Sequence, residues 1–254
     1  MKLSHKKILI LLLFIAILIL MILLNKNYEK FENSDPDDKY SIELSPKLTK
    51  NEIEDLKRGH RIMTDMFKEF DRICRKHNLK YWCIGGTLIG AVRHKGWIPW
   101  DGDIDVGMIE SDYKKLQTII QPELPEGLWF QDRTVDEHYK SDIGKVRYLE
   151  SIYKDYKDHS WHNGLQIDIF IYNEQDNKIT RYGKDIPYKI YPLKEVYFEN
   201  IKVYIPFEHE KYLTHHFGEK FMEYPDVNNR YPHEGRFGFY SPDWVKKKYP
   251  YLYK

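Results

Sequence analysis

The sequence predicts an α+β domain of mixed α/β type, preceded by one transmembrane helix. A run of 17 apolar residues at 8–24 stands apart near the N-terminus. Beyond residue 48, segments with an apolar residue at every third or fourth position are mixed with short alternating or continuous apolar segments. No internal repeat relates these segments, so strands and helices are expected to follow one another irregularly.

The apolar run at 8–24 is long enough to cross a thin bilayer as a helix of roughly 25 Å. Lys2, Lys6 and Lys7 precede the run, and this basic excess favours a cytoplasmic N-terminus. A cleaved signal peptide is the alternative, but its apolar stretch is usually about 7–15 residues and ends in small residues. Here the run ends in Leu-Leu-Asn-Lys at 23–26, which favours a type II signal anchor.

The anchor divides the chain into four expected parts. Residues 1–7 form a cytoplasmic tail, 8–24 the anchor, 25–48 a polar stalk and 49–254 the catalytic domain. That domain would lie in the lumen of the Golgi or the endoplasmic reticulum. Lys and Arg together number 40 against 39 Asp and Glu, so the charge gives no reason to expect a nucleic-acid partner.

The folded domain is expected to begin with a helix capped by Thr49, whose apolar residues over 53–74 recur at helical spacing. Residues 81–84 then predict a buried strand, 87–92 a short helix and 103–108 a second strand. A helix at 111–120 ends at Pro122 and Pro125. Later strands are expected at 128–131, 145–148, 165–171, 194–197 and 201–205, with a last helix at 208–217.

Two cysteines, Cys74 and Cys83, are too few for a disulfide framework or a four-cysteine zinc site. They could pair with each other or remain two buried thiols. His60 lies near the apolar residues of the first expected helix, and the pair at 215–216 has no cysteine or acid cluster that would complete a zinc site, so structural roles are expected for them.

Asp103 and Asp105 carry the first indication of chemistry. In a strand, residues two apart project on the same side, with Cα atoms roughly 6.5–7 Å apart. Two carboxylates in this arrangement suit Mg²⁺ or Mn²⁺, which prefer oxygen ligands and accept phosphate oxygens from a substrate. Asp168 is the expected third ligand, because it lies in an otherwise apolar strand where an unpaired charge is costly. All three are expected to be catalytic, and Asp168 is also expected to take the proton from the attacking hydroxyl. Asp101 is assigned a secondary role at the loop edge.

Gly85, Gly86 and Thr87 form a small-residue turn between a strand and a helix, which allows a close approach of phosphate to the backbone. Each of the acids alone could be solvated or paired with Arg or Lys. Together with the glycine turn, they predict a site for a nucleotide diphosphate and a metal ion.

Basic residues complete the expected donor site. Arg93 follows the glycine turn and could meet the donor phosphates, although it could equally lie on a solvated helix surface. Lys145 and Arg147, two apart on a predicted strand, would share a face and form a second phosphate clamp.

The segments Gly-Thr-Leu-Ile-Gly-Ala-Val-Arg-His-Lys-Gly (86–96) and Ile-Pro-Trp-Asp-Gly-Asp-Ile-Asp-Val-Gly-Met (98–108) resemble the LicD and fukutin family. Further similarity extends over most of residues 60–225. Family members commonly carry an acid where this chain has Gly102. The resemblance implies a nucleotidyltransferase-type mixed sheet flanked by helices. It also implies transfer of a phospho-alcohol, such as phosphocholine or ribitol phosphate, from a CDP-linked donor to a glycan.

Two other functions fit part of the pattern. A metal-dependent glycosyltransferase also uses an Asp-x-Asp pair, commonly in a type II membrane enzyme, but the Gly-Gly-Thr turn is not expected there. A non-catalytic, membrane-anchored glycan-binding protein could use the same acids to bind Ca²⁺. Release of CMP, rather than of a nucleoside diphosphate, would separate the first function from the glycosyltransferase.

Overall fold

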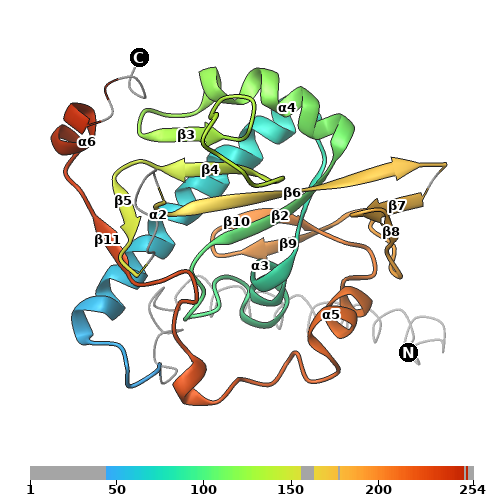
Figure 1. Ribbon diagram of the computed structural model, residues 1–254. Coiled ribbons are helices and arrows are strands. Elements are labelled where there is room, and N and C mark those ends of the chain that lie inside the picture. Colours follow the sequence, from blue (N-terminus) through green and yellow to red (C-terminus); the bar gives the residue numbers. More distant parts are fainter. Residues whose placement is uncertain (1–43, 156–162, 177, 249, 251–254) are drawn as a thin grey trace, which may run out of the picture. The chain divides into compact units, whose positions relative to one another are not determined.

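The computed structural model describes residues 44–155, 163–176, 178–248 and 250, and within them the expected mixed α/β class is confirmed (Figure 1). The predicted tail and anchor lie outside the described residues, as does the predicted stalk up to residue 43. No helix in the described part of the chain is long and apolar enough to cross a bilayer.

The main sheet joins strands that are far apart in the sequence, in the order β1-β2-β6-β4-β3. β2 and β6 run parallel, whereas the other neighbours in this order are antiparallel. A hairpin of two further strands continues from the far end of β6. The strands are β1 (Tyr81–Cys83), β2 (Ile104–Ile109), β3 (Leu128–Gln131), β4 (Gly144–Tyr148), β6 (Gln166–Gln175), β7 (Lys178–Arg181) and β8 (Lys184–Asp185).

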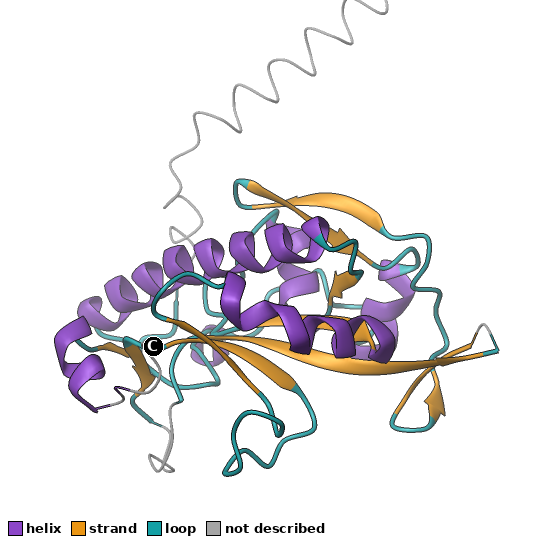
Figure 2. Ribbon diagram, turned by 90° about the horizontal axis from the view of Figure 1, so that it is seen from above, coloured by secondary structure: helices purple, strands orange, loops and turns teal. Residues whose placement is uncertain are grey.

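Two helices, α2 (Lys50–Lys76) and α4 (Glu110–Glu123), cover one face of this sheet (Figures 1 and 2). The expected cap of α2 is confirmed, since the Thr49 hydroxyl accepts from Glu52 N–H and the Glu52 carboxylate accepts from Thr49 N–H. Tyr81 of β1 packs on Phe67 and Phe70 of α2. Met108 of β2 pairs with Tyr81, so Met108 and every second residue of both strands from this pair face the helices.

Because side chains alternate along a strand, the residues between the helix-facing ones lie on the opposite face. We call this the site face and define it by Asp105 and Gly107 of β2, Asp168 and Phe170 of β6, and Lys145 of β4. On the helix-facing side, Ile104 and Ile169 are fully buried, and their burial fixes the register that brings the polar residues together.

The predicted hairpin at 194–205 is confirmed as β9 (Lys194–Phe198) and β10 (Ile201–Ile205). Phe198 contacts Phe67 of α2 edge-on, so this hairpin closes the aromatic core beside β1. The expected last helix is also present, as α5 (His209–Phe217).

Several elements differ from the sequence prediction. Helix α3 (Gly85–Ile89) begins at the first glycine rather than at Thr87, because Gly85 adopts a left-handed φ of 55° that starts the turn directly, and it continues as the π-helix η2 (Gly90–His94). Helix α4 passes through Pro122 and ends at Glu123. The elements that were not predicted are β5 (Ser151–Tyr153), β7, β8, the 3₁₀ turn η3 (Val227–Asn229), β11 (Phe237–Phe239) and α6 (Pro242–Lys248).

Cys74 and Cys83 are both free and buried, so the possible disulfide between them is not formed. Burial raises the pKa of both thiols, and the nearby Asp71 raises it further. Both cysteines therefore act as small core side chains.

Gly107 of β2 makes room for the indole of Trp82 on the neighbouring strand. A Cβ at Gly107 would lie 2.6 Å from the Trp82 ring, which is fully buried and cannot move away. We expect Gly107→Ala to lower the free energy of unfolding by about 1–3 kcal/mol, the usual cost of overpacking a core. Chemical unfolding followed by tryptophan fluorescence measures the free energy of unfolding, and an unchanged midpoint would contradict the close packing of Gly107 against Trp82.

Candidate functional site

A row of polar residues crosses the site face at one level of the sheet. The strand register places Asp105 of β2 beside Asp168 of β6, Asp168 beside Lys145 of β4, and Lys145 beside Gln131 of β3. These four residues come from distant parts of the sequence, and the pairing of their strands brings them together.

The three acids predicted from the sequence meet at this row, two of them within it and Asp103 just before β2. Asp103, Asp105 and Asp168 each offer a carboxylate oxygen, and the three oxygens lie within 4.8 Å of one another. A second group, Asp101, Asp103 and Glu234, meets the same criterion. Asp103 belongs to both groups, so the described residues form two adjoining sets of oxygen ligands around one shared carboxylate.

The loop that carries Asp101 and Asp103 is held by hydrogen bonds to its backbone. His60 Nε2 donates to the Asp101 carbonyl at 2.8 Å, and Tyr153 OH donates to the Gly102 carbonyl at 2.8 Å. His60 also stacks on Trp97, with ring centroids 4.2 Å apart. His60 therefore positions an acid of the site without being a ligand itself, in agreement with its expected structural role.

The glycine turn packs directly against the acids. A Cβ at Gly85 would overlap Asp105 Oδ2, and one at Gly86 would overlap Asp101 Oδ2. Thr87 is buried, and its hydroxyl accepts from Asp105 N–H at 2.8 Å. Gly85 N–H donates to Tyr212 OH at 3.1 Å. In this structure the turn thus supports the carboxylates, while its predicted contact with phosphate stays a prediction.

Glu234 is a site residue that sequence reasoning missed. It lies more than 120 residues beyond Asp103 and outside any motif recognised in the sequence. Its Oε2 atom is buried and has no hydrogen-bond partner among the described residues. A Cβ at position 102 would overlap this Oε2 atom, so Gly102 leaves the space that the Glu234 carboxylate fills.

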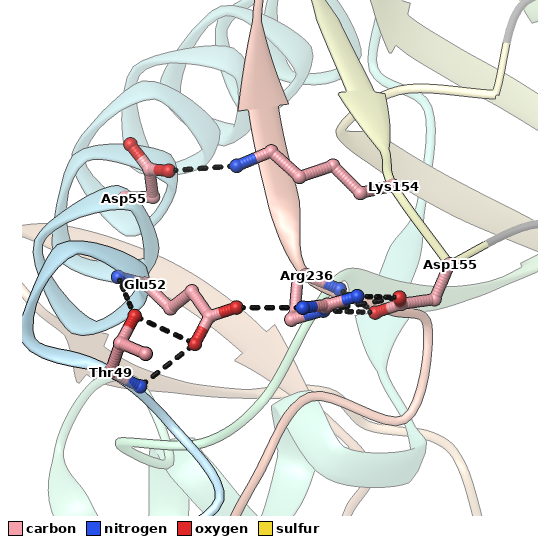
Figure 3. Close-up of polar contacts among 6 residues, drawn as sticks. All are labelled: Thr49, Glu52, Asp55, Lys154, Asp155 and Arg236. Atoms are coloured by element: carbon pink, nitrogen blue, oxygen red, sulfur yellow. Dashed lines mark hydrogen bonds and ion pairs between the residues drawn. The ribbon is translucent and has the colours of Figure 1, made fainter.

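Strand β11 and Arg236 fix the segment that carries Glu234. β11 pairs with β5, and Arg236 just before it bridges two acids (Figure 3). Its guanidinium donates to Asp155 from Nε at 2.8 Å and to Glu52 from Nη1 at 2.9 Å. Glu52 is also the capping residue of α2, so the C-terminal segment is tied to the start of the first helix.

Burial and mutual repulsion raise the pKa values of the clustered acids. Burial raises the pKa of Asp101 and Asp103 well above the ordinary range, and the neighbouring carboxylates raise it further. For Asp105, burial together with Asp168 and Glu234 raises the pKa to about 8, against the opposing effect of Lys145 and Arg181. Burial also raises the pKa of Glu234. Carboxylates this close together repel one another when ionised, so the cluster is stable only when it binds protons or cations.

The donor set fits a hard divalent cation. Every candidate ligand is a carboxylate oxygen, the ligand type that Mg²⁺ and Mn²⁺ prefer. The buried and unpartnered oxygen of Glu234 would gain a partner from such an ion. The residues present therefore suit the metal predicted from the sequence.

The predicted basic residues have protein partners in this structure. Lys145 Nζ donates to both oxygens of Asp168, at 2.5 and 2.6 Å. Arg147 is buried and donates to Gln131 at 2.5 Å and to Gln166 at 2.7 Å. The proposed phosphate contacts of this pair stay a prediction, since Lys145 already serves the acid cluster.

Arg93 of η2 binds the segment that follows α5. Its Nη1 donates to the carbonyls of Phe221 and Glu223, both at 2.8 Å, and its guanidinium lies 5.1 Å from the centre of the Tyr224 ring. Burial lowers the pKa of Arg93, while the charge of Asp101 opposes this shift. The charges of Arg93 and Asp101 thus interact, and the contact of Arg93 with a donor phosphate stays a prediction.

Comparison with known proteins agrees with the resemblance noted in the sequence. The family model described as LicD/FKTN/FKRP, nucleotidyltransferase domain, matches residues 78–208. The chain belongs to this family. The matched range includes the glycine turn, the acids at 101, 103 and 105, Lys145 and Asp168, whereas Glu234 lies beyond it.

Individual relatives of this LicD-family chain carry names from the same group. The lipopolysaccharide cholinephosphotransferase LicD of Haemophilus influenzae is 40% identical over 76 residues, which cover 30% of this chain and 24% of that protein. The human ribitol 5-phosphate transferase FKRP is 24% identical over 159 residues, 59% of this chain and 30% of that protein. An uncharacterized protein of Rickettsia typhi is 30% identical over 150 residues, 56% of this chain and 41% of that protein. Each alignment covers less than half of the relative.

Proposed function

We propose that this chain is a metal-dependent transferase that moves a phospho-alcohol from a CDP-linked donor to a hydroxyl of a glycan. The observation that carries the proposal is the pair of carboxylate groups joined by Asp103, whose members other than Glu234 lie in the range that the family model matches. The names of two relatives, a cholinephosphotransferase and a ribitol 5-phosphate transferase, support the transfer of a phospho-alcohol. We also propose that the mixed sheet is of the nucleotidyltransferase type.

In this proposal Asp103, Asp105 and Asp168 hold one cation, and Asp101, Asp103 and Glu234 hold a second. Bound there, cations would supply positive charge to the donor diphosphate and to the leaving nucleotide. Lys145 Nζ donates to both oxygens of Asp168 and so fixes the carboxylate that, in this proposal, accepts the proton of the attacking hydroxyl. Lys145 thereby orients the base.

The test is an assay of the full-length chain in detergent with Mg²⁺ or Mn²⁺, a glycan acceptor mixture and a panel of CDP-alcohols and nucleotide sugars. We expect release of CMP and an acceptor whose mass increases by a phosphorus-containing group. Release of a nucleoside diphosphate with transfer of a plain sugar would instead indicate a glycosyltransferase. Absence of turnover with every donor would contradict the proposal.

The type II membrane topology and a lumenal position in the Golgi or endoplasmic reticulum are also proposals, which rest on residues 2–26 of the sequence. Protease treatment of intact vesicles measures the topology. A C-terminal tag that is digested without detergent would contradict a lumenal domain.

Metal binding is expected to strengthen as the pH rises through about 8. Below that pH Asp105 holds a proton, because its pKa is raised to about 8, and a cation must displace this proton to bind. The apparent affinity should therefore increase by roughly tenfold per pH unit for the proton displaced, up to that pKa. Without metal the raised pKa of Asp105 affects the stability of the fold instead. The free energy of unfolding should then decrease as the pH rises from about 4 to 8, because the folded state binds the proton of Asp105 more tightly than the unfolded state does.

Thermal unfolding with and without Mn²⁺ at pH 6 and pH 8 measures this dependence. The rise in Tm caused by Mn²⁺ should be larger at pH 8, and Asp105→Asn should reduce the difference between the two pH values. Asp65→Asn, a change at an exposed carboxylate of α2, is the matched control and should behave as the wild type. An equal Tm increase at both pH values in the wild type would contradict the assignment.

A further inference from the structure

A pocket of about 590 Å³ opens between the β7–β8 hairpin and the last turn of α5. The hairpin extends from the far end of β6 (Figures 1 and 2). The volume lies within the range of about 300–1,000 Å³ that is usual for small-molecule sites. We call it the hairpin pocket. Its lining includes Arg181, Tyr182, Lys184, Tyr188, His215 and His216.

Arg181 connects the hairpin pocket with the acid cluster. Its guanidinium lies 4.6 Å from the ring centre of Phe170 and 5.4 Å from that of Tyr172. Phe170 and Tyr172 follow Asp168 at alternate positions of β6, so they share the site face, and Phe170 is roughly 6.6 Å along the strand from Asp168. The charge of Arg181 also reaches Asp105, whose pKa it lowers. Arg181 thus belongs to the pocket lining and also contacts the site face beyond Asp168.

A second connection runs through two tyrosines. Tyr188, which is buried in the pocket wall, packs edge-on against Tyr212, with ring centroids 4.9 Å apart. The Tyr212 hydroxyl accepts from Gly85 N–H at 3.1 Å, and Gly85 lies against Asp105. Packed side chains therefore connect the pocket wall with the glycine turn that lies against Asp105.

The charge of the hairpin pocket favours an anion. Arg181 and Lys184 carry positive charges, and neither forms an ion pair with a carboxylate in the part of the chain that the structure describes. Asp185 is the one acid among the lining residues. Burial lowers the pKa of His216, as do the charges of His215 and Arg181, so the attraction for an anion comes from Arg181 and Lys184.

The pocket also offers a ring surface to a planar ligand. Tyr182 is 71% exposed at the tip of the hairpin, and its ring lies 5.0 Å from the Arg181 guanidinium. Tyr188 presents its hydroxyl to His216 Nε2 at 2.9 Å. Cations combined with an exposed aromatic ring suit a ligand that joins a phosphate to a flat base.

We infer that the hairpin pocket binds the nucleoside monophosphate half of the donor, with Arg181 and Lys184 at its phosphate and Tyr182 against its base. The inference rests on the proposed transfer from a CDP-linked donor. In this arrangement the diphosphate bond that breaks lies at the carboxylates. The phosphate of the released CMP then lies at Arg181. A cationic pocket is a poor site for a positively charged alcohol such as choline, which would bind elsewhere.

Equilibrium dialysis of labelled CMP against the full-length chain in detergent tests this assignment. We expect Lys184→Gln to weaken CMP binding about threefold to tenfold, and Arg181→Gln with Lys184→Gln to weaken it more than tenfold. Lys178→Gln on the same hairpin, outside the pocket lining, is the matched control and should bind CMP as the wild type does. In turnover, Lys184→Gln should raise KM for the donor while kcat and the KM for the acceptor change little.

Competition identifies which part of the ligand the pocket holds. Inorganic phosphate should compete with CMP in the wild type and less in the Lys184→Gln variant, whereas cytidine should compete equally in both. Unchanged CMP affinity in both pocket variants would overturn the inference, as would wild-type protein that binds no CMP. A rise in KM for the acceptor alone would also overturn it, because the pocket would then serve the acceptor.

The outcomes separate this inference from the proposed function. If CMP binds in the pocket but no CDP-alcohol supports transfer, the proposed reaction fails and the nucleotide site stands. If transfer occurs and the pocket variants bind CMP normally, the reaction stands and the site lies elsewhere. Lys184 is exposed, so its variant keeps the test valid even if loss of the half-buried Arg181 disturbs the hairpin.

Discussion

Replacing Asp103 by Asn should abolish transfer, with a loss of at least about 1,000-fold in turnover. Asp103 is the one acid that belongs to both carboxylate groups, so the change weakens both candidate cation positions together. A bound cation contributes several kcal/mol to stabilising the transition state, and about 4 kcal/mol corresponds to 1,000-fold. The fold should survive, because the Asn side chain has nearly the same size and relieves repulsion among raised-pKa acids.

The measurement is CMP release at saturating Mg²⁺, together with thermal unfolding to confirm that the variant is folded. Asp65→Asn on the exposed side of α2 provides the matched control and should retain full activity. Glu234→Gln should cause a smaller loss than Asp103→Asn, because Glu234 belongs to one group only. A folded Asp103 variant that keeps more than a tenth of wild-type turnover would contradict the shared-ligand assignment.

The local part of the site could be predicted from the sequence because its signals are local. The glycine turn, the same-face spacing of Asp103 and Asp105, and the single acid in the strand around Asp168 are each visible within about ten residues. The register of two parallel strands then places Asp105 beside Asp168. Burial of the apolar residues that alternate with them leaves one register that keeps these residues in the core.

The non-local part could not be predicted. Glu234 reaches the cluster only because β11 pairs with β5 and because Arg236 binds Asp155 and Glu52. These strands have three residues each, too few for a periodic signal in the sequence. The strand order of the main sheet and the hairpin pocket depend on the same kind of long-range pairing.

The basic residues show a different limit of sequence reasoning. The pattern correctly placed Lys145 and Arg147 on one strand, but spacing alone does not say whether a cation faces a substrate or a neighbouring side chain. In the folded chain Lys145 donates to Asp168, and Arg147 donates to two glutamines. Arg181 lies in a hairpin that was not predicted, so its position over Phe170 of the site face could not be recognised.

Replacing Lys145 by Met is expected to have the largest effect on stability. Lys145 and Asp168 form a buried ion pair, with side chains only 11% and 9% exposed. Removing one partner of such a pair leaves an uncompensated charge and typically costs about 3–5 kcal/mol. Here the remaining charge sits among further carboxylates, so the loss should appear in full when a chelator keeps divalent cations away.

Chemical unfolding at pH 7 in the presence of a chelator, followed by tryptophan fluorescence, measures this loss. Lys154→Met provides the matched control, because Lys154 pairs with Asp55 on the surface and such exposed pairs contribute about 0–1 kcal/mol. Combining Lys145→Met with Asp168→Asn should restore part of the stability, since the double variant leaves no charge unpaired at this position. Mn²⁺ should also recover part of the loss in the single variant, because a cation replaces the missing ammonium beside Asp168. Equal losses for Lys145→Met and Lys154→Met would show that the buried pair does not neutralise the cluster.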